Sequence, residues 1–180
     1  MLNRLESNDE TVRTQAITQL QLELDEQAAH LPPHVFSGVI SRIYESALSL
    51  LNSDHKDRLV GLALLDCLLD VSDDAMPERR IETANILRKV VENDKLPSYD
   101  AELLKAAAKS LGHLARVAST TEIEFLQTYA EKHVFKWLND QRYEVRRFAA
   151  VLIVRELAVN APTIIFAKWK SGGVGKHSDN

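Results

Sequence analysis

The stretch EVRRFAAVLIVRELAVN, residues 144–160, repeats its apolar side chains every four residues. The positions that share this spacing are Val145, Ala149, Ile153 and Leu157. Because an α-helix completes a turn in about 3.6 residues, this spacing lines one helix face. The same spacing recurs around Ala16 and Ala107, and no segment sustains an alternation of apolar and polar residues. The sequence therefore predicts helices and no sheet.

A longer period is marked by small residues, each followed at four and eight positions by an apolar one. They are Ala16, Gly61, Ala107 and Ala149, at intervals of 45, 46 and 42 residues. Repeats of about 40 to 47 residues are typical of two-helix HEAT and armadillo units. The sequence thus predicts an all-α fold, a right-handed α-solenoid of about four such repeats. The expected helices cover residues 9–28, 34–52, 55–71, 77–93, 99–118, 121–139 and 142–160.

Proline and glycine divide the chain into parts. The five prolines fall between apolar runs, where a residue without an amide donor starts or stops a helix. We expect residues 1–33 to form a first partial repeat with an N-terminal helix, and residues 34–166 to form the HEAT- or armadillo-type repeats. Residues 167–180, which end in SGGVGKHSDN, are expected to be a flexible polar tail that does not belong to the repeat.

The predicted helix starts carry a charge pattern. An acidic residue precedes a basic one by four positions in two places, Asp9 with Arg13 and Asp54 with Arg58. Asn139-Asp140 is expected to open a later helix, with Arg146 in the position of Arg13. Such residues commonly ladder between the layers of HEAT-like arrays, whereas an exposed pair contributes little to stability. Both interpretations remain open at this point.

Composition excludes several classes of function. The chain has 22 Lys and Arg against 26 Asp and Glu, a net charge of −4, which disfavours a nucleic-acid partner. Its longest apolar stretch, residues 148–166, contains Arg155, Glu156 and Pro162 and does not predict membrane insertion. We expect a soluble protein of the cytoplasm, with the nucleus or the periphery of endomembranes as alternatives within a complex.

No catalytic residue, metal site or cofactor is predicted. Cys67 is the single cysteine and lies in an apolar helical pattern, where a thiol behaves as a small hydrophobic group. The six histidines show no recurring ligand spacing. The tail resembles a phosphate-binding loop only superficially, because Lys170 stands where that motif needs glycine and His177 stands where it needs Ser or Thr.

A basic edge is the candidate partner-facing site. Arg142, Arg146 and Arg147 are close in sequence and would dock an acidic partner or a phosphate. Asp140 and Glu144 beside them favour an alternative, a solvated face combined with a ladder between repeats.

The stretch NDQRYEVRRFAAVLIVRELAVNAPTIIF, residues 139–166, resembles the N-terminal HEAT-repeat region of the target of rapamycin (TOR) Ser/Thr kinases, which belong to the phosphatidylinositol-3-kinase-related kinases. The pattern there is similar to D-R-x-E-x-R-R-x-A-A-V-L-x-x-R-E-L-A, followed by P-T and aromatic residues. The residues at those positions are Arg146, Arg147, Ala149, Ala150, Val151, Leu152, Arg155, Glu156, Leu157, Ala158, Pro162, Thr163 and Phe166. The resemblance covers roughly residues 35–166 and includes LLNSDHKDRLVGLALLDCLLDV and LPSYDAELLKAAAKSLGHLARVA.

This resemblance implies a non-catalytic scaffold segment of a larger kinase that controls growth in response to nutrients. In the family, the N-terminal HEAT region shapes the dimeric complex and offers surfaces to the regulatory subunit raptor. The Gly-rich, H-R-D and D-F-G signatures of protein kinases do not occur in the sequence, so no enzymatic activity is expected of this chain. A free-standing HEAT or armadillo adaptor unrelated to a kinase is the alternative.

The sequence departs from the family after Phe166, where AKWKSGGVGKHSDN replaces the amphipathic helix that should follow. A truncated chain or fragment would leave the last repeat half built. We therefore expect exposed apolar side chains there, namely Val151, Ile164 and Ile165, and self-association through this C-terminal repeat face.

Overall fold

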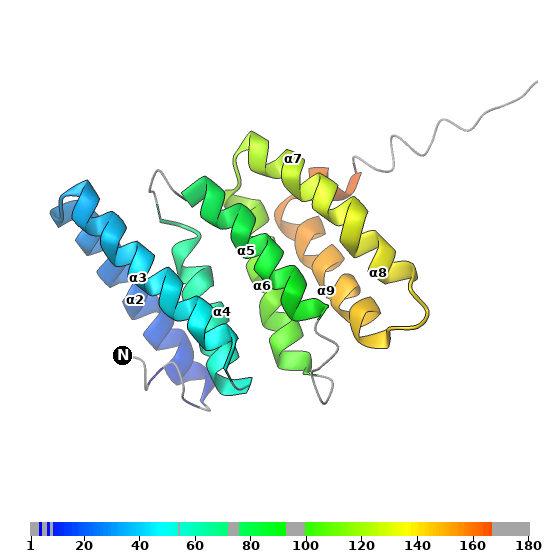
Figure 1. The fold of residues 1–180 in the computed structure, drawn as a ribbon, viewed down its shortest axis with the longest axis horizontal. Coiled ribbons are helices and arrows are strands. Elements are labelled where there is room, and N and C mark those ends of the chain that lie inside the picture. The colour runs from blue at the N-terminus through cyan, green and yellow to red at the C-terminus, as the bar shows by residue number, and fades with distance from the viewer. Residues whose placement is uncertain are drawn as a thin grey trace, which may run out of the picture. The chain divides into compact units, whose positions relative to one another are not determined.

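The computed structural model describes residues 4, 7, 9–53, 55–71, 76–92 and 100–166, without the side chains of Glu10, His55 and Lys56. Within these residues the regular structure is helical, with no strand, and the predicted all-α helical-repeat class is confirmed (Figure 1). The elements are α2 (Glu10–His30), α3 (Pro33–Leu51), α4 (His55–Leu68), α5 (Met76–Val91), α6 (Ala101–Val117), α7 (Thr120–Tyr129), η1 (Ala130–Val134), α8 (Phe135–Asn139) and α9 (Glu144–Asn160). The predicted tail and Asp54 lie outside the described residues.

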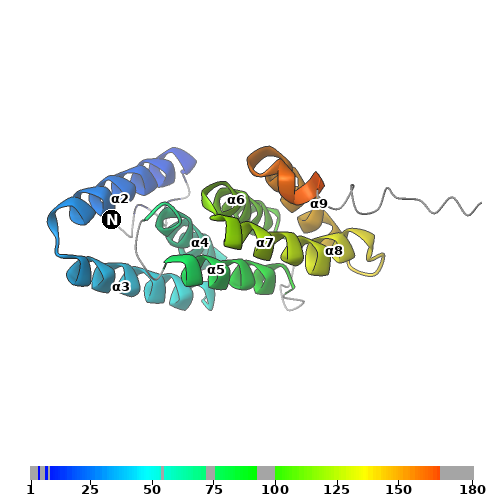
Figure 2. The same ribbon diagram turned by 90° about the horizontal axis from the view of Figure 1, so that it is seen from above.

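Local signals place the helix starts. The Asp9 carboxylate accepts the Thr11 backbone N–H at 2.8 Å before α2, and Asp100 accepts that of Leu103 at 3.0 Å before α6. Such N-caps satisfy amides that have no partner inside the helix. Ser119 begins α7 with a capping box, in which its own N–H donates to Glu122 Oε2 at 2.7 Å. Figures 1 and 2 show α7, η1 and α8 continuing as one rod.

The described chain divides into two compact units between Thr83 and Ala84, inside α5. In the first unit, α3 packs along α4, and α2 contacts both. The α3 side chains that face inward are Phe36, Ile40, Tyr44 and Ala47. Gly61 of α4 lies at a close approach to α3, since a Cβ there would stand 2.8 Å from the Ala47 carbonyl oxygen. The predicted role of Gly61 as a small residue at a helix crossing is confirmed.

In the second unit, α6 packs against α9, which also contacts η1 and α8. Ala107 and Ala149 are buried, as predicted for small residues of the seam. A close approach of the two helices lies at Gly112. A Cβ there would stand 2.8 Å from Glu156 Cβ and 2.9 Å from Asn160 Nδ2. The burial of Ala107 and Ala149 was therefore predicted, while the close approach at Gly112 was not.

Arg13 and Arg58 bond to the turn before their own helix, whereas Arg146, the predicted counterpart of Arg13, reaches the Glu92 carbonyl after α5. Arg13 Nη1 donates to the Ser7 carbonyl at 2.7 Å, and Arg58 Nε donates to that of Ser53 at 3.0 Å. At α9 the equivalent bond comes from Arg147, whose Nη1 donates to the Gln141 carbonyl at 2.9 Å. Arg13, Arg58 and Arg147 thus each close the turn that precedes their own helix, because free carbonyls there need donors.

Two expectations at the C-terminal end were wrong. Helix α9 begins at Glu144 after the N-cap residue Tyr143, and Asp140 lies in the preceding turn instead of opening the helix. Ile164 is only 2% exposed, because residues 162–166 form a further helical turn that packs inward. Val151 is exposed as expected, and Ile165 is half-buried.

In the described part of the chain, no helix has the length and apolar content needed to cross a membrane.

Candidate protein-binding surface

The turn between α8 and α9 carries the predicted basic edge. Arg142 is the outermost of its residues, with a side chain that is 80% exposed. Its Nε lies 3.2 Å from Asp140 Oδ1, and its backbone N–H donates to the same oxygen at 3.0 Å. These hydrogen bonds from Arg142 hold the pKa of the Asp140 carboxyl below its usual range. The pair fixes the turn while leaving most of the guanidinium group in solvent.

Two guanidinium groups lie over the ring of Tyr143. The Cζ atom of Arg146 stands 4.1 Å from the centre of the tyrosine ring, and that of Arg142 stands 5.6 Å from it. Arg146 also donates from Nη2 to the Glu92 carbonyl at 3.3 Å. Cations are attracted to the face of an aromatic ring, so the exposed Tyr143 side chain is held in a defined position.

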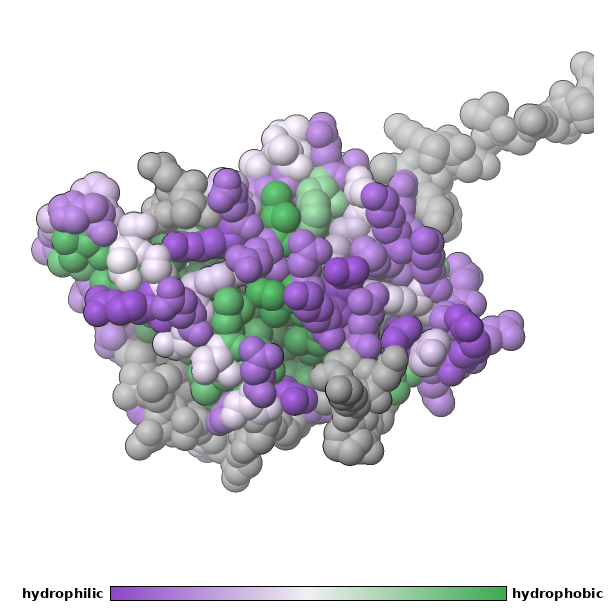
Figure 3. Space-filling view, in the orientation of Figure 1, coloured by the Kyte–Doolittle hydropathy of each residue, from purple (hydrophilic) through white to green (hydrophobic). Residues whose placement is uncertain are grey.

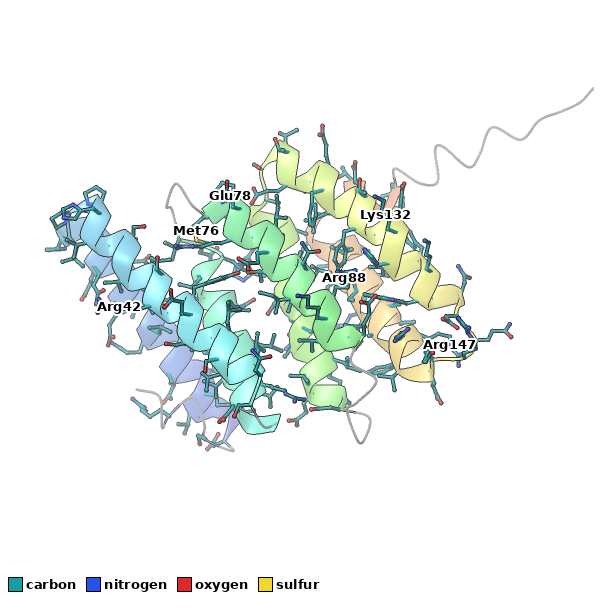
Figure 4. The ribbon with its side chains drawn as sticks, viewed as in Figure 1. Arg42, Met76, Glu78, Arg88, Lys132 and Arg147 are labelled. Atoms are coloured by element: carbon teal, nitrogen blue, oxygen red, sulfur yellow. The ribbon has the colours of Figure 1, made fainter. Side chains whose placement is uncertain are left out.

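Arg147, in the first turn of α9, donates hydrogen bonds to the turn between α8 and α9. Its Nη1 donates to the carbonyls of Asp140 and Gln141, at 3.3 and 2.9 Å. Figure 4 places Arg147 at the start of α9, beside this turn. The structure therefore brings Arg142, Arg146 and Arg147 together, as the sequence predicts. Only Arg142 leaves most of its guanidinium group exposed, since the other two are partly buried.

An open groove of about 810 Å³ adjoins the turn. It is lined by Glu131, Phe135, Lys136, Asn139, Asp140, Gln141 and Arg142. Both signs of charge are present, and in Figure 3 the side of the α7–α8 rod that faces the viewer is mostly hydrophilic. The sequence analysis missed this groove because its wall comes from η1 and α8 and its end from the turn.

A row of aromatic rings runs along the rod. Phe125, Tyr129, His133 and Trp137 follow at four-residue spacing, with ring centroids 6.2, 5.4 and 6.0 Å apart. The π-helical segment η1 lies in the middle of this row, and such segments are frequent at functional sites. The sequence analysis did not single out this row, although the four-residue aromatic spacing was the signal available for it.

His133 is the titratable member of the row. Burial and the neighbouring Arg88 lower the pKa of its imidazole. Figure 4 shows Arg88 on the side of α5 that faces the α7–α8 rod. Arg88 also pairs with Glu92, at 3.9 Å. These contacts favour the neutral imidazole at neutral pH.

The structure also describes the surroundings of Cys67 and of the side chains that could bind a metal ion. Cys67 is buried in α4, and burial raises the pKa of its thiol to about 12, so the thiol is protonated at neutral pH. Among the residues with described positions, no three His, Cys, Asp or Glu side chains are grouped closely enough to hold a metal ion.

The chain is similar over most of its length to curated kinases from plants and fungi. It is 34% identical over 146 residues, 81% of the chain, to the serine/threonine-protein kinase TOR of Oryza sativa. It is 32% identical over 145 residues to that of Arabidopsis thaliana and 28% identical over 163 residues to tor1 of Schizosaccharomyces pombe. The chain is a homologue of one segment of the TOR kinases. This TOR-like chain spans only 6 to 7% of the length of these relatives, and it matches no protein-family model and no solved structure.

Proposed function

We propose that the TOR-like chain is a non-catalytic helical-repeat scaffold that acts by binding protein within a nutrient- and growth-signalling assembly. One observation carries the proposal, namely that 78 to 90% of the chain aligns with 6 to 7% of TOR kinases. A helical segment that is so small a part of a kinase would act by shaping the complex and by contacting partner proteins. Two-helix repeats cannot bury their apolar faces alone, and stacking them creates an extended binding surface.

We propose that phosphoryl transfer takes place outside this chain. Kinases position ATP with a Gly-rich loop and hold magnesium with the Asp of D-F-G, and neither motif occurs in the sequence. The buried Cys67 and the arginines of the α8–α9 turn supply no substitute for these groups. We therefore propose that this chain binds other proteins, within a soluble complex of the cytoplasm.

The proposed partners are a raptor-like regulatory subunit or the remainder of a TOR-like chain. The proposed contact is the α8–α9 turn, where Arg142 and Tyr143 are exposed beside the groove. Arginine and tyrosine are enriched among the residues that dominate interface energetics. An acidic segment of the partner would pair with Arg142 in place of solvent.

Co-purification tests this proposal. The tagged chain is mixed with a raptor-type subunit and, separately, with a TOR kinase from which the matching segment has been deleted. We expect binding to at least one of them, reduced about tenfold by Arg142→Glu because the substitution reverses the exposed charge. Lys105→Glu is the matched control, since Lys105 is exposed on α6 and does not line the groove. Absence of binding to both proteins would contradict the proposal.

Genomic sequence separates the proposal from a free-standing adaptor. If an open frame continues helical repeats towards a kinase domain beyond the codon for Phe166, the chain is part of a TOR-type kinase. A stop codon conserved among close relatives at the end of the tail would favour the adaptor.

A further inference from the structure

Three cationic side chains lie on the solvent side of the helix pair α6 and α9. Lys109 and Arg116 belong to α6, Arg155 belongs to α9, and all three are exposed. Lys109 and Arg116 are seven residues apart, close to two helical turns, so they lie on one face of α6. We call Lys109, Arg116 and Arg155 the basic stripe.

The packing of the two helices brings Arg155 beside the cations of α6. Within the second unit, α6 and α9 lie along each other in one layer, and the α7–α8 rod lies in the other layer (Figure 2). Because the rod covers one side of the α6–α9 layer, exposed residues in the middle of both helices face the opposite side. A Cβ at Gly112 would stand 2.8 Å from Glu156 Cβ, and Lys109 and Arg155 are each within about one turn of this contact.

No described group neutralises the basic stripe. None of its three side chains has a hydrogen bond or an ion pair to another described residue. The sequence also puts no carboxylate three or four positions from any of them, the spacing at which helix charges pair. Lys105 is not counted in the stripe, because the exposed Glu102 stands three positions before it. The stripe is thus a local excess of positive charge in a chain whose net charge is −4.

Helix stability accounts for only one of these charges. The helix dipole favours a cation in the last turn, which explains Arg116. Lys109 lies in the middle of α6, four residues after Lys105, and like charges at that spacing repel. Arg155 lies more than one turn before the end of α9. Charges that break a local rule without a gain for the fold are expected at functional surfaces.

Charge and size narrow the chemistry of the partner. A long polyanion or an anionic membrane responds to the field of the whole chain, whose net charge is negative. A short segment responds mainly to charges within a Debye length, about 8 Å at physiological salt. Lys109 and Arg116 are about 10 Å apart along α6. Carboxylates three residues apart in an extended peptide have nearly the same separation.

We infer that the basic stripe binds a short acidic segment of a partner protein, with carboxylates three residues apart. The inference rests on the proposed function and deepens it, because it names the chemistry recognised at a second surface. This surface does not include the α8–α9 turn, and the test below uses neither a raptor-type subunit nor a kinase. The co-purification and the peptide test can therefore fail separately.

The test measures binding of fluorescent peptides to the full chain by anisotropy. One peptide of about twelve residues has Glu at every third position among Gly and Ser, and the other has Gln in place of each Glu. The Glu peptide should bind about tenfold more tightly, and its affinity should fall as salt rises from about 50 to 200 mM. Lys109→Glu and Arg155→Glu should each weaken it about tenfold. Lys132→Glu makes the same change of charge on the exposed side of the rod and should leave the affinity within about twofold (Figure 4).

Three results would overturn the inference. One is equal binding of the Glu and Gln peptides. Another is an equal loss of affinity in Lys132→Glu and Lys109→Glu, because net charge and not the stripe would then attract the peptide. The third is tighter binding of a uridine oligonucleotide or of phosphatidylserine vesicles that Lys109→Glu abolishes, because the stripe would then bind a nucleic acid or a membrane. Thermal melting of every variant checks that the fold is retained, and it should be, since each changed residue is exposed.

Discussion

Gly61 and Ala47 hold α4 against α3 at a distance that leaves no room for a side chain. A Cβ at Gly61 would stand 2.8 Å from the Ala47 carbonyl oxygen and 3.1 Å from the Leu51 backbone nitrogen. Both are backbone atoms, so relief requires a shift of the helix. We expect Gly61→Ala to lower the free energy of unfolding by about 1 to 2 kcal/mol, because crowding exceeds the gain of about 1 kcal/mol from better helix propensity.

Urea denaturation measures this effect, and Gly38→Ala is the matched control. Gly38 lies inside α3, and a Cβ there meets nothing within 4 Å. The control should raise the free energy of unfolding by about 0.5 to 1 kcal/mol, through helix propensity alone. Equal effects of the two substitutions would show that α3 and α4 do not approach as described.

Arg80 is expected to anchor the end of α4. Its Nε and Nη2 both donate to the Leu69 carbonyl, at 3.1 and 2.7 Å. Arg80→Ala should lower the free energy of unfolding by about 1 to 2 kcal/mol, because the partly buried carbonyl loses two charge-assisted donors. Arg80→Lys should recover only part of the loss, since an ammonium group cannot reproduce the paired geometry. Full recovery by lysine, measured by urea denaturation, would contradict the two-bond arrangement.

His133 should make stability depend on pH. Burial and Arg88 lower its pKa in the folded chain, with smaller contributions from Lys136 and Lys132 that Glu92 opposes. The unfolded chain, with an ordinary pKa near about 6.5, therefore binds a proton more readily than the folded one. Stability should be complete above about pH 7 and fall as the pH drops through 6.5. Melting temperatures of wild type and His133→Gln check this, and identical pH profiles of the two would refute it.

Cys67 should react slowly in the folded chain. Burial raises the pKa of its thiol to about 12, so little thiolate exists near pH 8, and the side chain is inaccessible as well. Iodoacetamide should label the native protein far more slowly than the protein in urea, as followed by mass spectrometry. Equal rates would place Cys67 at the surface.

The helices could be predicted from the sequence because their signals are local. Asp9 and Asp100 cap the helices that follow them, and Pro33 begins α3, each close to the predicted start. Burial of Ala16, Ala107 and Ala149 followed from the apolar spacing in the same way.

The remaining features depend on which helix lies against which. The close approach at Gly112 requires the crossing point of α6 and α9, and burial of Ile164 requires the turn of helix after Ala161. The sequence predicted that the arginines of the basic edge lie together, but it did not predict which groups each of them contacts. Arg147 bonds to the turn while Arg146 lies over Tyr143, a difference decided by one helical position.

The account rests on the claim that this chain contributes binding surface to a TOR-type assembly. The most direct measurement replaces the matching segment of the Oryza sativa TOR kinase with this chain and compares recovery of the kinase's bound subunits with that of the parent and of a deletion. We predict that the chimera recovers them at the parental level, whereas the deletion does not. Equal recovery by the deletion and the parent would contradict the claim.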